Sequence, residues 1–232
     1  MAQVSEHPTS AVPMFPLGTV LFPGMSVPLR VFEDRYRALV HHLLREPDPA
    51  MRLFGSVAIR EGYEVGEHGA QSLYRVGCLL QLTEVEANPD GTFEVVAVGR
   101  DRIRLDRLEA GGPYPAGQVT MVPEAEVAVS EELLSAARDT FTAYRAAVSA
   151  YRADPLGDPG TATLPKDPTM LSWTLAAVAP LPMAERQALL EAEDAAQRLT
   201  LVTGMLRQEL RAMSVIASLP ATEMARTRWS PN

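Results

Sequence analysis

The side chains of this sequence that are best suited to nucleophilic or acid–base chemistry are few and widely separated. They are the histidines, the single cysteine and the single lysine, namely His7, His41, His42, His68, Cys78 and Lys166. A serine nucleophile needs a neighbouring base, and a lysine serves as that base only where its surroundings lower its pKa. Lys166 lies in the proline-flanked stretch LPKDP, which is typical of a loop. We therefore expect no catalytic residue in this chain.

The same residue types do not indicate a metal or nucleotide site. His41 and His42 are neighbours, so on a helix they point about a quarter-turn apart, whereas a helical zinc pair is spaced by four residues. The chain has no Gly-x-x-x-x-Gly-Lys-Ser/Thr stretch to hold phosphates and no Gly-x-Ser-x-Gly nucleophile turn. Glu193 and Asp194 are adjacent carboxylates of the kind that any acidic surface provides. We expect neither a cofactor nor a bound metal.

Three arginines, Arg100, Arg102 and Arg104, alternate along the strand-like stretch GRDRIRLDRLE. On a strand they project from one face, which is a plausible surface for an anion or a nucleic acid. The alternative is that they form ion pairs across the sheet with acidic residues such as Glu84, Glu86 and Glu94. The net charge of −8 and the lack of interleaved aromatic residues favour the ion pairs. Nucleic-acid binding is kept as the second interpretation of the chain.

Apolar residues gather around the proline-rich stretch FPGMSVPLRVFEDRY. Phe22, Met25 and Phe32 flank its turns, and Arg35 and Tyr36 begin the helical spacing that follows. Methionine and phenylalanine at the rim of a loop can form an adaptable surface for extended apolar peptides. The alternative is that the three apolar residues plug the mouth of the fold. We predict a polypeptide-binding surface at these five residues.

The first half of the chain is predicted to be mostly β-structure, because short β-branched and apolar runs alternate with turn residues. The expected strands are 12–17, 27–31, 53–59, 74–86, 93–98, 102–108 and 117–121. Asp90-Gly91 favours a hairpin between the fourth and the fifth of them. One helix is expected from Glu33 onward. Its apolar stripe consists of Phe32, Tyr36, Leu39, Val40 and Leu43, which recur at helical spacing.

Four prolines indicate what kind of sheet these strands form. Proline has no amide hydrogen, so within strand patterns it is confined to edges, strand ends and bulges. Pro13, Pro16, Pro23 and Pro28 therefore indicate short, bent strands joined by a tight turn at Phe22-Pro23-Gly24. A small closed or half-closed barrel accommodates such strands, whereas a flat sheet does not.

The second half of the chain is predicted to be helical. A seam for packing against another helix is formed by Leu134, Ala137, Phe141, Tyr144, Val148 and Tyr151. Asp167-Pro168 supplies an N-cap and a first helical residue, and Asp194 with Gln197 marks the start of the last helix. We expect a β-rich unit over residues 10–125, a helical unit over 126–215 and a loose tail over 216–232.

Composition narrows the class of protein. A chain of 232 residues with 47% hydrophobic and 22% charged residues is typical of a globular protein with a substantial core. The longest apolar runs are too short to cross a bilayer, so no membrane-spanning helix is expected. A single cysteine cannot form an internal disulfide, and the N-terminus has no secretory apolar region. We therefore expect the protein to be cytoplasmic.

The proline-rich stretch resembles the start of the Lon N-terminal domain family. The shared pattern is Phe-Pro-Leu, Phe-Pro-Gly-Met, Pro-Leu, Phe-Glu and Arg-Tyr, and these motifs begin here at Phe15, Phe22, Pro28, Phe32 and Arg35. The stretch VGRDRIRL resembles the glycine–arginine strand of the family. The stretch from LPKDPTML to GMLRQEL resembles its helical tail, so that the resemblance spans about residues 12–210.

The resemblance implies an α+β fold, namely a PUA-like six-stranded pseudobarrel with one intervening helix, followed by a C-terminal helical subdomain. In Lon proteases this region recognises substrates, and the ATPase and the Ser-Lys peptidase lie downstream. The present chain, which ends at Asn232, is expected to contain neither. The implied function is non-catalytic binding of unfolded or degron-bearing polypeptides, with an ATP-dependent protease as a further partner.

Overall fold

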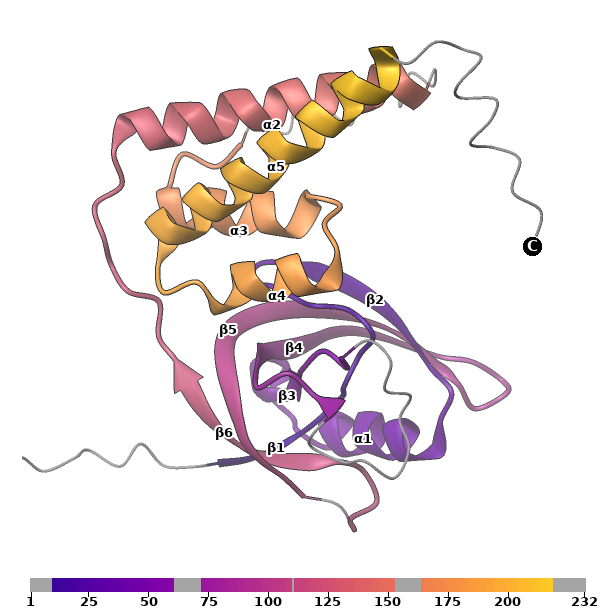
Figure 1. The fold of residues 1–232 in the computed structure, drawn as a ribbon. Helices are drawn as coiled ribbons and strands as arrows, with labels where there is room; N and C mark the ends of the chain where they lie inside the picture. Colours follow the sequence, from indigo (N-terminus) through magenta and orange to yellow (C-terminus); the bar gives the residue numbers. More distant parts are fainter. Residues whose placement is uncertain (1–9, 61–71, 110, 153–163, 219–232) are drawn as a thin grey trace, which may run out of the picture.

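The structure is a computed structural model that describes residues 10–60, 72–109, 111–152 and 164–218 (Figure 1). Strands dominate the first half of the chain and helices the second, which confirms the predicted α+β class. In chain order the elements are β1 (Ser10–Pro13), β2 (Ser26–Val31), α1 (Asp34–Leu44), the short 3-10 helix η1 (Pro49–Met51), β3 (Leu53–Ser56), β4 (Val76–Ala87), β5 (Phe93–Glu109), β6 (Ala116–Val122), α2 (Glu131–Arg152), α3 (Pro168–Val178), α4 (Met183–Glu191) and α5 (Ala195–Ser218).

The six strands form one sheet in the order β1-β6-β5-β4-β3, with β2 paired to β5, and all these pairs are antiparallel. The sheet closes on itself because the chain after β1 runs alongside β3. Phe15 N donates to the Gly55 carbonyl at 2.8 Å, and Leu17 N donates to the Val57 carbonyl at 3.1 Å. This closure confirms the bent pseudobarrel, against which α1 lies (Figure 1).

One long strand, β5, joins the two ends of the barrel. Its first part pairs with β2 and β4, and its second part pairs with β4 and β6. The sequence predicted two separate strands here. They are continuous because a β-bulge at Arg100 bends the chain without ending the strand: Leu80 pairs with Gly99 and Leu79 with Asp101, so Arg100 has no opposite residue on β4.

The turn at Phe22-Pro23-Gly24 is held against β5 at Gly99. Gly24 N donates to the Gly99 carbonyl, and Gly99 N donates to the Met25 carbonyl, both at 2.9 Å. Gly24 has φ 78°, in the left-handed region that favours glycine. A Cβ atom on Gly99 would lie 2.1 Å from the Phe22 carbonyl oxygen, so this approach of two backbones requires glycine at position 99.

Two local predictions in the β-rich half are confirmed and one is wrong. β4 and β5 form the predicted hairpin, with Gly91 at φ 79° in its turn. In α1 the apolar stripe is buried as predicted at Tyr36, Leu39, Val40 and Leu43. Phe32 does not belong to this stripe. It precedes the helix, which begins at Asp34, and its side chain is exposed.

The helices α2 to α5 form a layer beside the barrel (Figure 1). The predicted seam of α2 is buried at Leu134, Ala137, Phe141 and Tyr144, and α2 packs against α5. Both predicted caps are present, because Asp167 Oδ1 accepts from Met170 N and Asp194 Oδ1 accepts from Gln197 N, each at 2.8 Å. Helix α4 was not predicted.

Among the described residues, the apolar core consists of three clusters. The first lies between α1 and the strands around it, and the second fills the other part of the barrel around Met14 and Ile103. The third lies among the helices and continues onto the barrel through Val20, Phe22 and Ala58. The barrel and the helical layer therefore share a core. Within the described residues, no helix has both the length and the apolar character needed to cross a membrane.

Candidate functional site

A hollow of about 230 Å³ lies beside the start of α1, and we call it the Phe32 hollow. It is lined by the chain after β1, by the end of β2, by the first turn of α1 and by Ile59; the residues are Phe15–Gly18, Leu29–Glu33, Arg35, Tyr36 and Ile59. The hollow therefore brings together three of the five residues predicted to bind polypeptides. These three are Phe32, Arg35 and Tyr36.

Phe32 has the most exposed large apolar side chain among the described residues, at 64%. Strand geometry places it there. Val31, the last residue of β2, points into the core, so the next side chain points away from it. Glu33 is then extended as the N-cap residue, and the helix begins after it. Leu29 and Ile59 are half-buried beside Phe32, which gives the hollow an apolar rim.

The charged groups that line the hollow are paired: Arg35 with Glu33, and Arg30 with Glu94 of β5 at 3.5 Å. Arg35 Nη2 lies 2.6 Å from Glu33 Oε2, and Arg35 Nε donates to the same oxygen at 2.9 Å. The guanidinium also covers the Tyr36 ring at 4.6 Å, and that ring stacks on Phe15 with centroids 3.9 Å apart. Burial raises the pKa of Tyr36, while Arg35 lowers it and Glu33 raises it by smaller amounts. The tyrosine hydroxyl is therefore neutral at physiological pH, and the hollow is apolar with little net charge.

The prediction that Phe22 and Met25 belong to the same surface is wrong. Phe22 is fully buried, with its ring centroid 6.1 Å from that of Trp173 and the Arg186 guanidinium 4.8 Å above it. Met25 is half-buried and packs against both the α1 cluster and the helical cluster. Both residues lie where the helical layer meets the barrel, and Phe22 plugs the fold, as in the alternative interpretation.

The three arginines of β5 do not form one exposed row. Arg100 lies in the bulge, and Arg104 is exposed and donates from Nε to Asp106 Oδ1 at 2.9 Å. Arg102 is only 4% exposed. The predicted partner Glu94 pairs instead with Arg30 of β2, at 3.5 Å. Because the middle arginine is covered, the row that motivated the nucleic-acid interpretation is absent from the described surface.

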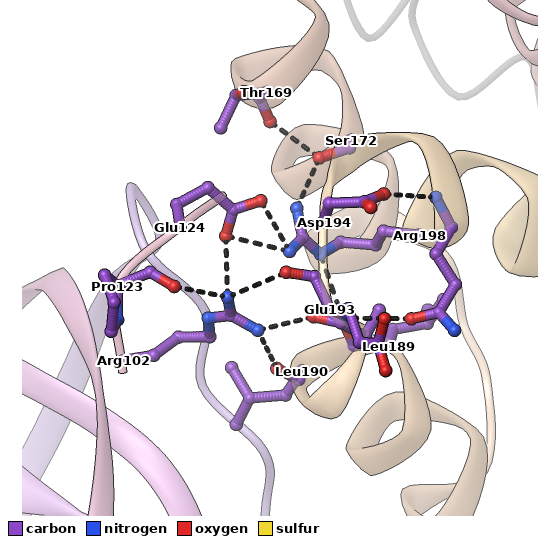
Figure 2. Close-up of polar contacts among 12 residues, drawn as sticks. Arg102, Pro123, Glu124, Thr169, Ser172, Leu189, Leu190, Glu193, Asp194 and Arg198 are labelled. Atoms are coloured by element: carbon purple, nitrogen blue, oxygen red, sulfur yellow. Dashed lines mark hydrogen bonds and ion pairs between the residues drawn. The ribbon is translucent and has the colours of Figure 1, made fainter. Parts of the chain in front are cut away.

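Arg102 belongs to a buried ionic cluster between the barrel and the helices (Figure 2). Glu124 lies between two guanidinium groups: Arg102 Nη2 is 3.0 Å from its Oε2, and Arg198 Nη2 is 2.9 Å from its Oε1. Arg198 Nη1 also donates to Ser172 Oγ at 2.7 Å, and its guanidinium carbon lies 3.2 Å from the Trp173 ring centroid. Burial lowers the pKa of both arginines, that of Arg198 to about 10, and Glu124 partly offsets this effect.

Carbonyl groups complete this cluster, because one carboxylate cannot neutralise two cations. Arg102 donates to the carbonyls of Pro123 and Leu190 at 3.2 Å, and Arg198 Nε donates to the carbonyl of Leu189 at 3.2 Å. Glu124 and Arg198 were not predicted from the sequence as members of a site. One signal was present in the sequence: Arg198 lies four and eight residues before Val202 and Leu206, on the buried face of α5.

The remaining candidate residues that the structure describes do not come together in one site. His41 and His42 are exposed and lie next to the rings of Phe93 and Tyr114 respectively. Lys166 is exposed before α3. His7 and His68 lie outside the described residues. Within the described ranges, no group of three or more histidine, cysteine, aspartate or glutamate side chains is placed to hold a metal ion.

Cys78 should resist thiol reagents in the folded protein. Its side chain is fully buried in β4, and burial raises the pKa of the thiol to about 12, so little reactive thiolate forms at mildly alkaline pH. Labelling by a colorimetric disulfide reagent should therefore be slow in buffer and rapid in concentrated guanidinium chloride. Fast labelling in buffer, at a rate equal to that of the unfolded chain, would contradict the assignment of Cys78 to the core.

Sequence comparison relates this arrangement to a known family. Residues 11–208 match the family model of the ATP-dependent protease La (LON) substrate-binding domain. "Lon protease 2" of Herpetosiphon aurantiacus is 30% identical over 215 residues, which covers 92% of this chain and 26% of that protein. "Lon protease" of Escherichia coli K12 is 26% identical over 207 residues, covering 88% of this chain and 25% of that protein. The chain thus spans about a quarter of the length of these relatives.

Solved structures share the fold. The Lon N-terminal domain protein from Xanthomonas campestris aligns with a TM-score of 0.59 and 23% identity, over 91% of this chain and 99% of that one. The N-terminal domain of the Mycobacterium avium complex Lon protease aligns with a TM-score of 0.61 and 22% identity, over 85% and 98% of the two chains. At these identities the comparison establishes the architecture of the barrel and the helical layer.

Proposed function

The chain belongs to the family of substrate-binding domains of the ATP-dependent protease La (LON), and we propose that it binds polypeptide segments that lack stable structure, through the Phe32 hollow. The family is named as the substrate-binding domain of a protease, and the substrates of a protease are polypeptides in general. The proposal adds the place and the chemistry of binding. It assigns contact roles to Phe32 and to the half-buried apolar residues around it.

The exposure of Phe32 carries this proposal. Burying a phenylalanine side chain is worth about 1.5–3 kcal/mol, and the folded protein leaves most of that unused at this position. An apolar side chain of a partner that enters the hollow would contact Phe32, Leu29 and Ile59 together. Since Arg35 is already paired with Glu33, the site favours apolar segments over strongly charged ones. Such segments are exposed in unfolded chains and buried in folded ones.

The proposed role is binding without catalysis. The relatives from Herpetosiphon aurantiacus and Escherichia coli are named proteases. The part of each that matches this chain is about a quarter of the protein, and it corresponds to the substrate-binding domain. We propose that this chain holds degron-bearing or unfolded polypeptides and presents them to an ATP-dependent protease. We place this function in the cytoplasm, because the single cysteine is a buried free thiol that needs no oxidising compartment.

Replacing Phe32 by serine tests the proposal. We expect the Phe32→Ser variant to bind a reduced, carboxymethylated unfolded protein about tenfold more weakly than the wild type, since about 1.4 kcal/mol of apolar contact would be lost. Fluorescence anisotropy of the labelled ligand gives the dissociation constant. Stability should be nearly unchanged, because the side chain is exposed.

Met170→Ser is the matched control. Met170 is a similarly exposed apolar residue on α3, outside the hollow, so its replacement should leave the dissociation constant unchanged. Equal affinities for the wild type and the Phe32→Ser variant would reject the Phe32 hollow as the binding site. Equal weakening by both substitutions would indicate nonspecific adsorption to apolar surface.

A further inference from the structure

The Phe32 hollow runs along an edge of β2 and not over a face of the sheet. Its lining includes Leu29, Arg30, Val31 and Phe32, which follow one another in the chain. Successive side chains of a strand point to opposite faces, so a hollow over one face would be lined only by every second residue. A consecutive run indicates that the hollow lies beside the backbone. None of the described residues of β5 lines it, so it lies at the edge of β2 that β5 does not occupy.

Two hydrogen bonds show which backbone groups of β2 face β5. Gly99 N donates to the Met25 carbonyl at 2.9 Å, and this pair continues the register of β2 and β5 by one residue. On β5, the Val96 carbonyl accepts from Thr83 Oγ1 of β4 at 3.0 Å, so the backbone groups of Val96 face β4. Val96 lies opposite Pro28. Both observations place Pro28 in a pair that is not hydrogen-bonded, because such pairs alternate with hydrogen-bonded ones along an antiparallel ladder.

Pro28 and Arg30 therefore turn their backbone groups toward the hollow, whereas those of Leu29, which lies between them, face β5. Pro28 suits this position, since proline lacks an amide hydrogen and is tolerated in a strand where that hydrogen would face away from the partner. In the described part of the chain, the Arg30 amide and the carbonyls of Pro28 and Arg30 have no backbone partner. β2 thus has an open edge along the hollow, and open edges pair readily with an added strand.

The chain across the hollow does not close this edge. Phe15 N and Leu17 N donate to carbonyls on the far side of that chain, those of Gly55 and Val57. The residue between the two donors turns its backbone toward the hollow by the same alternation, and this residue is Pro16, which has no amide hydrogen. Proline therefore occurs on both sides of the hollow. Among the described residues no backbone hydrogen bond joins the two sides, so the barrel is open there.

The open edge lacks hydrogen-bond partners that a polypeptide backbone supplies. A strand laid beside β2 would accept from the Arg30 amide and donate to the carbonyls of Pro28 and Arg30. The backbone groups of a folded protein are already paired with each other, whereas an unfolded segment presents them to water. The edge therefore selects chains that lack stable structure, whatever their sequence.

The side chains around the edge add a preference for one apolar group and none for charge. A bound segment would bring one of its side chains against Phe32 and Leu29, which line the hollow. Arg30 is paired with Glu94 at 3.5 Å and Arg35 with Glu33 at 2.6 Å, so neither arginine requires an acidic ligand. Recognition would thus depend first on the backbone of the ligand and then on one apolar side chain.

We propose that the Phe32 hollow binds its polypeptide as a short strand added to the open edge of β2, opposite Pro28 and Arg30, with one apolar side chain against Phe32. This inference rests on the proposed function and adds the conformation of the ligand and the groups by which it is recognised. The substrate class is extended segments with unpaired backbone amides, of varied sequence and charge.

Backbone N-methylation of a peptide probe tests the added strand. The probe is the acetylated and amidated peptide Thr-Thr-Val-Leu-Val-Thr-Thr, with one amide nitrogen methylated at a time. In a bound strand successive amides point to opposite edges, so only every second amide faces β2. Methylation of those amides should weaken binding at least about tenfold, and methylation of the amides between them should weaken it far less, as measured by titration calorimetry. Equal effects at neighbouring positions would overturn the proposal.

Amide hydrogen exchange followed by NMR gives a readout in the protein itself. In the free protein the Arg30 amide should exchange much faster than the Leu29 amide, which faces β5. Saturating probe should slow exchange of the Arg30 amide at least about tenfold, because it would become hydrogen-bonded. Unchanged exchange of Arg30 at saturation would contradict the added strand. Slow exchange of Arg30 in the free protein would also contradict it, since the edge would then already be covered.

Substitutions separate this inference from the proposed function. Arg30→Pro removes the edge amide, whereas Arg30→Ala removes the same side chain and keeps the amide, so the proline variant should bind the probe at least about tenfold more weakly than the alanine variant. The methylation and exchange experiments use the wild-type protein and do not depend on how the proline variant folds. If the two variants bind equally while Phe32→Ser weakens binding, the added strand is rejected and the proposed function stands. If Phe32→Ser also leaves the affinity unchanged, both proposals fail.

Discussion

Replacing Glu124 by glutamine should lower the free energy of unfolding by about 3 kcal/mol, because two buried guanidinium groups would lose the carboxylate that they share. Glutamine keeps the size of the side chain and removes its charge, so the effect would be electrostatic. Breaking a buried ion pair typically costs about 3–5 kcal/mol. We expect the lower end because the Glu124 side chain is 24% exposed, which lets water compensate part of the loss. Urea denaturation measures the change.

Glu126→Gln is the control for this prediction. Glu126 lies two residues further along the chain and is exposed, so the same substitution should change the free energy of unfolding by less than about 0.5 kcal/mol. A loss at Glu124 no larger than that at Glu126 would mean that the carbonyl groups alone neutralise Arg102 and Arg198. It would then be wrong to regard the cluster as a contribution to stability.

Gly99→Ala should lower the free energy of unfolding by at least as much, about 3 kcal/mol or more, and so reduce the yield of folded protein. The added Cβ would lie 2.1 Å from the Phe22 carbonyl oxygen and 3.1 Å from Cys78 Sγ. Neither group can move easily, since the Phe22 side chain and Cys78 are both buried. Relieving the contact would separate the Phe22-Pro23-Gly24 turn from β5 and break the two backbone hydrogen bonds made by Gly99.

Gly204→Ala, in contrast, should stabilise the folded protein. Gly204 is exposed in α5, and a Cβ there would have no atom within 4 Å. Alanine should raise the free energy of unfolding by about 0.5–1 kcal/mol through its higher helix propensity. Thermal unfolding followed by circular dichroism compares both variants with the wild type. A Gly99→Ala protein as stable as the wild type would show that the turn can move away from β5 at little cost.

Features set by neighbouring residues could be predicted from the sequence. Asp167-Pro168 determined where α3 begins, and Asp90-Gly91 determined the hairpin, because capping and turn formation depend on a few consecutive residues. Helix α4 was missed for the same reason. Its buried residues are the polar Gln187 and the adjacent pair Leu189 and Leu190, so the buried apolar residues alone show no helical spacing, and two prolines precede the helix.

Features set by packing between distant segments could not be predicted. Phe22 and Phe32 both flank turns in the same stretch, yet one is buried under α3 and α4 and the other faces solvent. That difference depends on where the helical layer lies, which no local pattern specifies. Arg102 likewise has the same strand spacing as Arg104, but two of the carbonyl groups that accept from it come from the end of α4 and the residue just after it, far along the chain. The fold was therefore more predictable than the site.

The pairing of β1 with β6 has a consequence for how the chain is made. Ser10 lies opposite Val119, so the first strand emerges from the ribosome long before the strand that receives it. Throughout that interval the nascent chain carries an unclosed apolar sheet, which is the kind of surface that aggregates or recruits chaperones. A protein that we propose to hold the unfolded segments of others is thus itself such a segment for much of its own synthesis.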